Sequence, residues 1–186
     1  MRKFKKENLE KIQIDYGIVF VDYGLATEKR LGPTRGGATF EANATYRDIE
    51  FDGRLGKTMG LRPIDEIEAV LRITAMDISQ GNLQIAMPYL ELNESTQALE
   101  CKTTPLLDDS AYMSNMVMFA KLVDGKYKKI TLYNALNEGA FSLNAAPKAE
   151  GTVDMEVYAH WDPVETDLDH TNIDKLFQVE EVSALA

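Results

Sequence analysis

A strict alternation of apolar and polar residues is the feature that most constrains how this chain can fold. Ile67, Ala69, Leu71 and Ile73 alternate with Glu66, Glu68, Arg72 and Thr74. Residues 38–46 and 152–161 show the same period of two. Because successive side chains of a strand point to opposite faces of its sheet, the pattern predicts strands with one face on a core and the other in water.

Two apolar segments predict further strands. Residues 18–21 form a short, continuous apolar run, which predicts a short strand. Residues 116–123 are apolar on nearly both faces, as in a strand that is buried on both sides. Asp124 and Gly125 then predict a tight turn into an antiparallel partner strand over residues 127–133.

One short helix is expected among these strands. Ser79 is a suitable N-cap residue and Pro88 ends the segment, so the helix should lie between them. Glycine and proline are frequent in residues 25–37 and 52–63, which predicts two long loops. The fold expected is an all-β sandwich or barrel with one short flanking α-helix, an extended loop and terminal arms.

Charge is unevenly distributed along the chain, which has 30 acidic and 20 basic residues and a formal net charge of −10. Residues 1–15 hold five basic and three acidic side chains, whereas residues 162–186 hold seven acidic side chains and one lysine. We expect a basic N-terminal arm over 1–15, a β-sandwich domain over 16–161 and an acidic C-terminal arm over 162–186. These arms can be two solvated ends, or they can bind complementary surfaces on neighbouring copies.

The composition disfavours several classes of protein. The overall acidity argues against general nucleic-acid binding, because a phosphate-binding surface needs a positive patch. No run of about 20 apolar residues is present, so no membrane anchor is expected. The basic N-terminus is not followed by the apolar segment of a secretory signal. Cys101 is the only cysteine, which excludes an intrachain disulfide and favours synthesis in a reducing cytoplasm.

Catalytic chemistry has few candidate residues. The two histidines, His160 and His170, lie near Asp162, Asp167 and Asp169 in the sequence. Imidazole and carboxylate groups suit zinc or manganese, so a metal-binding or hydrolytic β-sandwich is an alternative. We favour it less, because His160 belongs to the polar face of an expected strand and the aspartates belong to the tail. The expectation is a protein that is not an enzyme and has no cofactor.

The loop over residues 52–63 combines cations with apolar side chains. It carries Arg54, Lys57 and Arg62 together with Leu55, Met59 and Leu61. Exposed apolar side chains in a long loop are costly for an isolated subunit and usually mark a contact surface. The alternative is a loop that folds back on its own domain.

Several short segments between residues 19 and 88 resemble a known family. They are VFVDYGLATE at 19–28, TRGGATF at 34–40, RDIE at 47–50, DGRLGK at 52–57, GLR at 60–62, ITAMDI at 73–78 and NL at 82–83. Together they are similar to the N-terminal part of the tail tube, or major tail, proteins of long-tailed bacteriophages. No motif among them is catalytic, and beyond residue 88 the likeness rests on strand order and length.

The resemblance implies a β-sandwich subunit of a siphovirus tail tube, in which hexameric rings stack into a hollow conduit for DNA ejection. It implies self-association, contacts with tape-measure and tail-tip or terminator proteins, and DNA that passes through without specific binding. The implied location is the virion tail, assembled in the cytoplasm of the bacterial host. The inner tube protein of a contractile phage or a tailocin is the alternative within the same class.

Two groups of residues receive roles in such a tube. Carried over by position, the inter-ring contacts would be Arg54, Leu55, Lys57, Met59 and Arg62. The candidates for facing the lumen are Glu41, Glu66, Glu68, Asp154 and Glu156, because each alternates with apolar residues of the sandwich interior. Carboxylates in a lumen would repel phosphates, so that DNA slides through.

Overall fold

Strands dominate the computed structural model of the protein. The structure describes residues 10, 12–14, 17–50, 52–53, 56–101, 106–143, 150–162 and 175–183. Its strands are β1 (Ile18–Val21), β2 (Lys29–Arg30), β3 (Thr34–Tyr46), β4 (Ile64–Ala75), β5 (Leu90–Asn93), β6 (Ala98–Cys101), β7 (Met113–Lys121), β8 (Tyr127–Asn137), β9 (Val153–Tyr158) and β10 (Phe177–Val182). The helix α2 (Gln80–Ala86) and one turn of 3₁₀ helix, η1 (Asp109–Ala111), complete the described part of the chain. The expected all-β fold with one short α-helix is confirmed.

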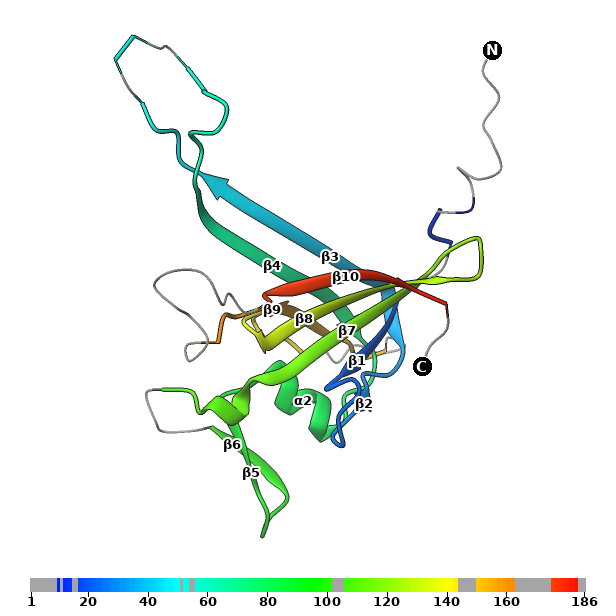
Figure 1. Ribbon diagram of the computed structural model, residues 1–186. Helices are drawn as coiled ribbons and strands as arrows, with labels where there is room; N and C mark the ends of the chain where they lie inside the picture. The colour runs from blue at the N-terminus through cyan, green and yellow to red at the C-terminus, as the bar shows by residue number, and fades with distance from the viewer. Residues whose placement is uncertain are drawn as a thin grey trace.

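The strands form one large antiparallel sheet and one small ribbon. The large sheet has the order β2-β1-β7-β8-β9-β4-β3, and β10 also pairs with β8. The ribbon consists of β5 and β6 alone and extends from the body near α2 (Figure 1). The turn expected at Asp124 and Gly125 joins β7 to β8, which pair antiparallel as predicted. Gly125 has a φ of 85°, which suits a residue without a Cβ atom.

Strand β8 folds the large sheet into two layers. One edge of β8 pairs with β7, while its other edge pairs first with β10 over residues 127–132 and then with β9 at Leu136 and Asn137. Asn134 lies between these two pairings and has a φ of 46°, in the left-handed region that few residues other than glycine adopt. The backbone therefore bends at this point, and β8 contributes hydrogen bonds to both layers.

The core lies between the two layers. Its buried side chains come from both layers and include Val19, Leu71, Met116, Leu132 and Met155. Phe40 of β3 meets Phe177 of β10 with ring centroids 5.3 Å apart, so β10 packs against the opposite layer. These side chains lie at the apolar positions of the alternating pattern, and their burial away from water is the main stabilising term of such a fold.

Strand β7 is buried on both faces, as its continuous apolar run predicted. Met116 and Met118 point into the core, while Val117 and Phe119 on the other face are 1% exposed. Phe119 is covered there by Phe20 and Tyr23 in edge-to-face contacts, with ring centroids 5.8 Å and 5.1 Å away. Aromatic pairs in this geometry contribute stability beyond the area they bury.

Strands β3 and β4 form a long hairpin that extends well beyond the two layers (Figure 1). Their antiparallel register runs from Ala38↔Ile73 to Tyr46↔Ile64. The row of apolar side chains that faces the core continues along this hairpin, beyond the opposite layer. No described side chain of that layer covers it there, and Tyr46, Ile64 and Ile67 are 52%, 53% and 36% exposed. The hairpin is therefore amphipathic over its whole length, although only its base contributes to the core.

Two predictions about loops and arms need correction. Residues 25–37 are not a single loop, because β2 lies within them and β3 begins at Thr34. Gly36 and Gly37 adopt φ values of 75° and 83° in a register shift of the β3–β4 pair, so the strand starts four residues earlier than expected. The expected C-terminal arm over residues 162–186 contains β10, which is part of the sheet.

The predicted helix is confirmed as α2, although Ser79 does not cap it through its side chain. The Asp77 side chain instead accepts a hydrogen bond of 2.9 Å from the Ser79 backbone N–H. No helix in the described part of the chain is long and apolar enough to cross a membrane.

Candidate assembly surfaces

One face of the β9-β4-β3 layer carries all five of the carboxylates that are predicted to face a lumen. The register pairs Thr45 with Glu66, Glu41 with Val70, and Arg72 with Glu156, so these side chains share the face that points away from the core. The five carboxylates of this acidic face are Glu41, Glu66, Glu68, Asp154 and Glu156. Alternation alone was enough to predict that they lie together, whereas their position in a tube stays a prediction.

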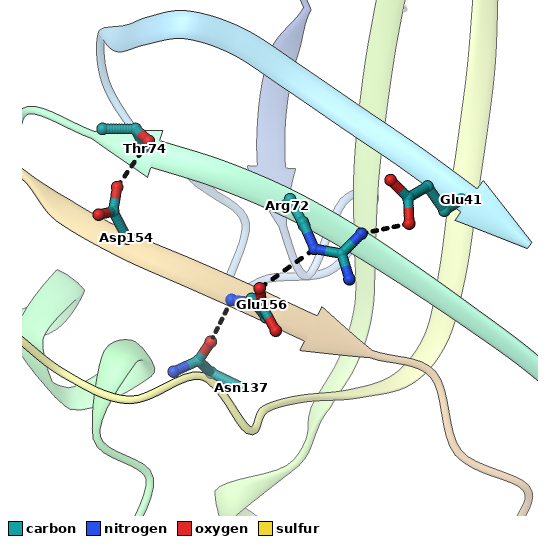
Figure 2. A network of polar contacts seen from close by, with 6 residues as sticks. All are labelled: Glu41, Arg72, Thr74, Asn137, Asp154 and Glu156. Atoms are coloured by element: carbon teal, nitrogen blue, oxygen red, sulfur yellow. Dashed lines mark hydrogen bonds and ion pairs between the residues drawn. The ribbon is translucent and has the colours of Figure 1, made fainter.

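Arg72 lies in the middle of the acidic face and binds two of its carboxylates (Figure 2). Its guanidinium forms an ion pair with Glu41 on β3 and another with Glu156 on β9, where Nε lies 3.1 Å from Oε1. The hydrogen bonds that the guanidinium donates to Glu41 and then to Glu156 raise the pKa of Arg72 above its ordinary value. The face thus carries five carboxylates and one guanidinium, and remains acidic.

A second polar pair on this face joins Thr74 to Asp154. The Thr74 hydroxyl donates a hydrogen bond of 2.6 Å to the Asp154 carboxylate across β4 and β9 (Figure 2). The roles of Arg72 and Thr74 could not be predicted from the sequence, because the cross-strand partners of these residues depend on the register. The sequence indicated only that both residues lie on the polar side of the alternating strand.

Asn137 fixes the position of β9 from behind the acidic face. Its side chain is 4% exposed, and its Oδ1 accepts a hydrogen bond of 2.8 Å from the Glu156 backbone N–H. Its Nδ2 donates a hydrogen bond of 2.7 Å to the carbonyl of Ala86 at the end of α2. One buried amide therefore links β8, β9 and α2, which holds Glu156 beside Arg72.

The loop between β3 and β4 carries the residues predicted for inter-ring contacts. Met59 is 99% exposed and Lys57 is also exposed, whereas Arg54 and Leu55 lie outside the described residues. Arg62 pairs with Asp48 at 2.8 Å and lies over the Tyr46 ring, 5.1 Å from its centroid.

The base of this loop continues the hairpin. Backbone N–H groups of Arg47 and Ile49 donate to the carbonyls of Pro63 and Leu61, each at 3.1 Å. The loop stands at the far end of the hairpin, away from the two layers (Figure 1). The alternative in which this loop folds back on its own domain is therefore wrong for its described residues.

The charges of β10 are satisfied within the chain. Glu180 pairs with Lys129 at 2.8 Å, and Glu181 pairs with Lys126 at 2.7 Å. The two glutamates of β10 therefore pair with lysines of β8 and of the turn before it, within their own domain, whereas an arm would pair with a neighbouring copy. Residues 163–174 of the expected arm lie outside the described residues.

The N-terminal arm expected over residues 1–15 is described only at residues 10 and 12–14. The backbone N–H of Ile14 donates to the Lys121 carbonyl at 3.0 Å, and that of Val123 donates to the Ile12 carbonyl at 2.9 Å. This short piece follows the end of β7. The cluster of basic residues before it lies outside the described residues.

His160 uses both ring nitrogens in contacts with its own chain. Nδ1 lies 3.1 Å from the Asn134 carbonyl and Nε2 lies 3.0 Å from the Glu138 carboxylate. The ring also meets Tyr112 edge-on, with centroids 5.2 Å apart. His170, Asp167 and Asp169 lie outside the described residues. Within the described ranges, no group of three or more His, Cys, Asp or Glu side chains is placed to hold a metal ion.

Comparison with known proteins adds no assignment. No model of a known protein family matches the sequence, and no curated protein matches it. The fold, the acidic face and the exposed hairpin are therefore the features that bear on function.

Proposed function

We propose that this protein is the structural subunit of a bacteriophage tail tube. In this proposal, copies join side by side into hexameric rings, the rings stack into a hollow tube, and DNA leaves the virion through it. The protein performs no catalysis in this role. Its partners are further copies of itself, tape-measure and tail-tip or terminator proteins, and it is assembled in the host cytoplasm into the virion tail.

The observation that carries the proposal is the long amphipathic hairpin of β3 and β4. Its polar side continues the acidic face with Glu66 and Glu68, and its apolar side exposes Ile64 and Ile67. A monomer rarely keeps a strand pair of this length with neither side covered, because exposed apolar surface and open strand edges promote association. A subunit that is completed by its neighbours explains both properties.

The edge of the sheet supports the same conclusion. Strand β3 is 13 residues long and pairs with β4 on one side, while no described strand pairs with its other edge. Backbone N–H and C=O groups along such an edge are ready to pair with a strand of another copy. Pairing around a closed ring would remove the open edge from every copy.

The acidic face suits the inner wall of a DNA conduit. Five carboxylates and one guanidinium leave a net negative surface, which repels phosphate groups. A basic wall would bind the DNA backbone tightly and release counterions, as nucleic-acid-binding proteins do. In the proposed lumen, DNA would therefore pass along a surface that does not bind it.

Electron microscopy of the purified protein in negative stain tests the proposal. We expect rings or long hollow fibres at high protein concentration, or after addition of a tail-tip complex that serves as a nucleus. Sedimentation that shows only monomers under both conditions would contradict it.

A further inference from the structure

The apolar side of the β3–β4 hairpin is continuous with the core but is exposed at its outer end. Ala44 pairs with Ile67 and Tyr46 pairs with Ile64, so these four side chains share the side on which Phe40 packs against the core. The three large ones among them are exposed. We call these four residues the apolar hairpin surface. A patch of this kind on a sheet marks a place where a second apolar surface binds.

Strand β10 of the opposite layer also leaves part of its core-facing side exposed. Phe177 and Val179 lie on this side, directly opposite Leu132 and Ile130 of β8. Phe177 packs on Phe40 of β3, whereas Val179 is 48% exposed. Strand β10 therefore covers the β3 layer near its first residue, and Val179 lies further along the strand, toward the turn that joins β7 to β8.

The two exposed surfaces extend from the body of the molecule in different directions. Figure 1 shows the tip of the β3–β4 hairpin at the upper left and the turn between β7 and β8 at the right. The apolar hairpin surface points to the side on which β10 lies, and Val179 points to the side on which β3 lies. A second copy that is shifted sideways can therefore place its β10 over the hairpin of the first, with the two layers in the same order. The contact between Phe40 and Phe177 shows that β10 packs on this side of the β3–β4 pair within one chain.

We infer that β10 of one copy covers the apolar hairpin surface of the next copy, with Val179 packed against Ile64 and Ile67. This inference rests on the proposed function and names the surfaces through which neighbouring copies of a ring meet. The two surfaces are different, so each copy offers its hairpin to one neighbour and its β10 to the other. Such a head-to-tail contact repeats around a ring and does not end at a dimer.

Threonine substitutions on the two surfaces test the inference. Ile67→Thr and Val179→Thr should each raise the protein concentration needed for assembly by about tenfold, because each removes apolar area from the contact. The double variant should raise it by less than the product of the two single effects, because both side chains belong to one contact. Leu92→Thr on the β5–β6 ribbon is the matched control, since Leu92 is 38% exposed and Ile67 is 36% exposed. It should assemble at the wild-type concentration, and far-UV circular dichroism of every variant should match the wild type.

Cross-linking gives an independent readout in a Cys101→Ser background. One protein carries Ile67→Cys, and a second, enlarged by a tag, carries Val179→Cys. The two are mixed before assembly, and a short bismaleimide is added to the assembled product. We expect a cross-linked species that contains one copy of each protein. Assemblies of either protein alone, and a mixture of the Val179→Cys protein with a Leu92→Cys protein, are the controls and should give no cross-linked dimer.

The outcomes separate this inference from the proposed function. Tubes that form normally from the two cysteine variants but give no mixed cross-link would overturn β10 as the cover of the hairpin and leave the tube in place. A cross-linked dimer of the Ile67→Cys protein alone would show that two hairpins cover each other, which would overturn it in the same way. Failure of the wild-type protein to assemble under any condition would overturn both.

Discussion

Buried asparagine side chains hold the parts of this molecule together at the residue scale. Asn82 in α2 is fully buried, and its Nδ2 donates to the carbonyls of Leu31 and Asp77 at 2.9 Å and 3.0 Å. Its Oδ1 accepts a hydrogen bond of 2.7 Å from the Lys29 ammonium group. A buried polar group is stable only when it is fully hydrogen-bonded, and Asn82 meets this condition through three partners in two segments of the chain, residues 29–31 and Asp77.

Replacement of Asn82 by alanine should therefore destabilise the fold. The Asn82→Ala variant leaves the Leu31 and Asp77 carbonyls and the Lys29 ammonium group without this partner, and we expect a loss of about 3 kcal/mol. Urea denaturation measures this loss as a lower midpoint with an unchanged slope. Asn43→Ala on the exposed side of β3 is the matched control and should change stability by no more than about 0.5 kcal/mol.

Arg72 should matter through charge rather than packing. In Arg72→Gln the carboxylates of Glu41 and Glu156 lose their shared cation, so the remaining acidic face repels itself. We expect a lower thermal midpoint in low salt and a smaller difference in high salt, because salt screens exposed charges. Arg72→Lys keeps the charge and should stay closer to the wild type. An equal loss for both variants in both salts would show that the charge is not the cause.

At the scale of elements, the strands that bury one face against the core could be predicted from the sequence. Strands β1, β4 and β9 and helix α2 lie within a few residues of the positions that the alternation and the flanking residues indicate. The five carboxylates of the acidic face followed from the same period of two. Burial of one face is a local property of the pattern, so no knowledge of the partner strands was needed.

Strand β10 could not be predicted in the same way. Its sequence, FQVEEV, lies in an acidic segment, and its two glutamates concealed the strand pattern. They are stabilised by lysines of β8, with Glu180 opposite Lys129 and Glu181 opposite Lys128 in the register. Opposite charges in such positions stabilise a sheet, but the pairing joins segments about 50 residues apart. The basic run KYKKI at 126–130 was the only signal in the sequence.

The bend in β8 offers a test at this scale. Asn134 has a φ of 46°, and its side chain donates to the His160 carbonyl at 3.2 Å. Asn134→Gly and Asn134→Ala both remove this hydrogen bond, but only alanine keeps a Cβ atom, which is unfavourable at a positive φ. We expect the glycine variant to be the more stable of the two by about 1 kcal/mol in chemical denaturation. Equal stability would mean that the bend does not depend on this backbone conformation.

At the scale of the whole molecule, the proposed tube would give each of three surfaces on the β3–β4 hairpin a role. The acidic face extends from β9 onto this hairpin, which also carries the open edge of β3 and the exposed tip around Met59. An isolated subunit leaves all of them in water. In a tube, lateral pairing would cover the edge, stacking would cover the tip, and only the acidic face would stay in contact with solvent and DNA.

The charge of that face should decide whether assembled tubes bind DNA. Glu66 and Glu68 lie on the exposed part of β4, where Glu66→Lys with Glu68→Lys should leave assembly intact and create a basic stripe. Wild-type tubes should not retain duplex DNA, and the neutral control, Glu66→Gln with Glu68→Gln, should retain little. The lysine variant should retain DNA in a way that weakens steeply with salt, which co-sedimentation at increasing salt measures. Because the series changes only the charge at two positions, equal retention by all three tubes would place these side chains away from the path of DNA, even if the tubes themselves form.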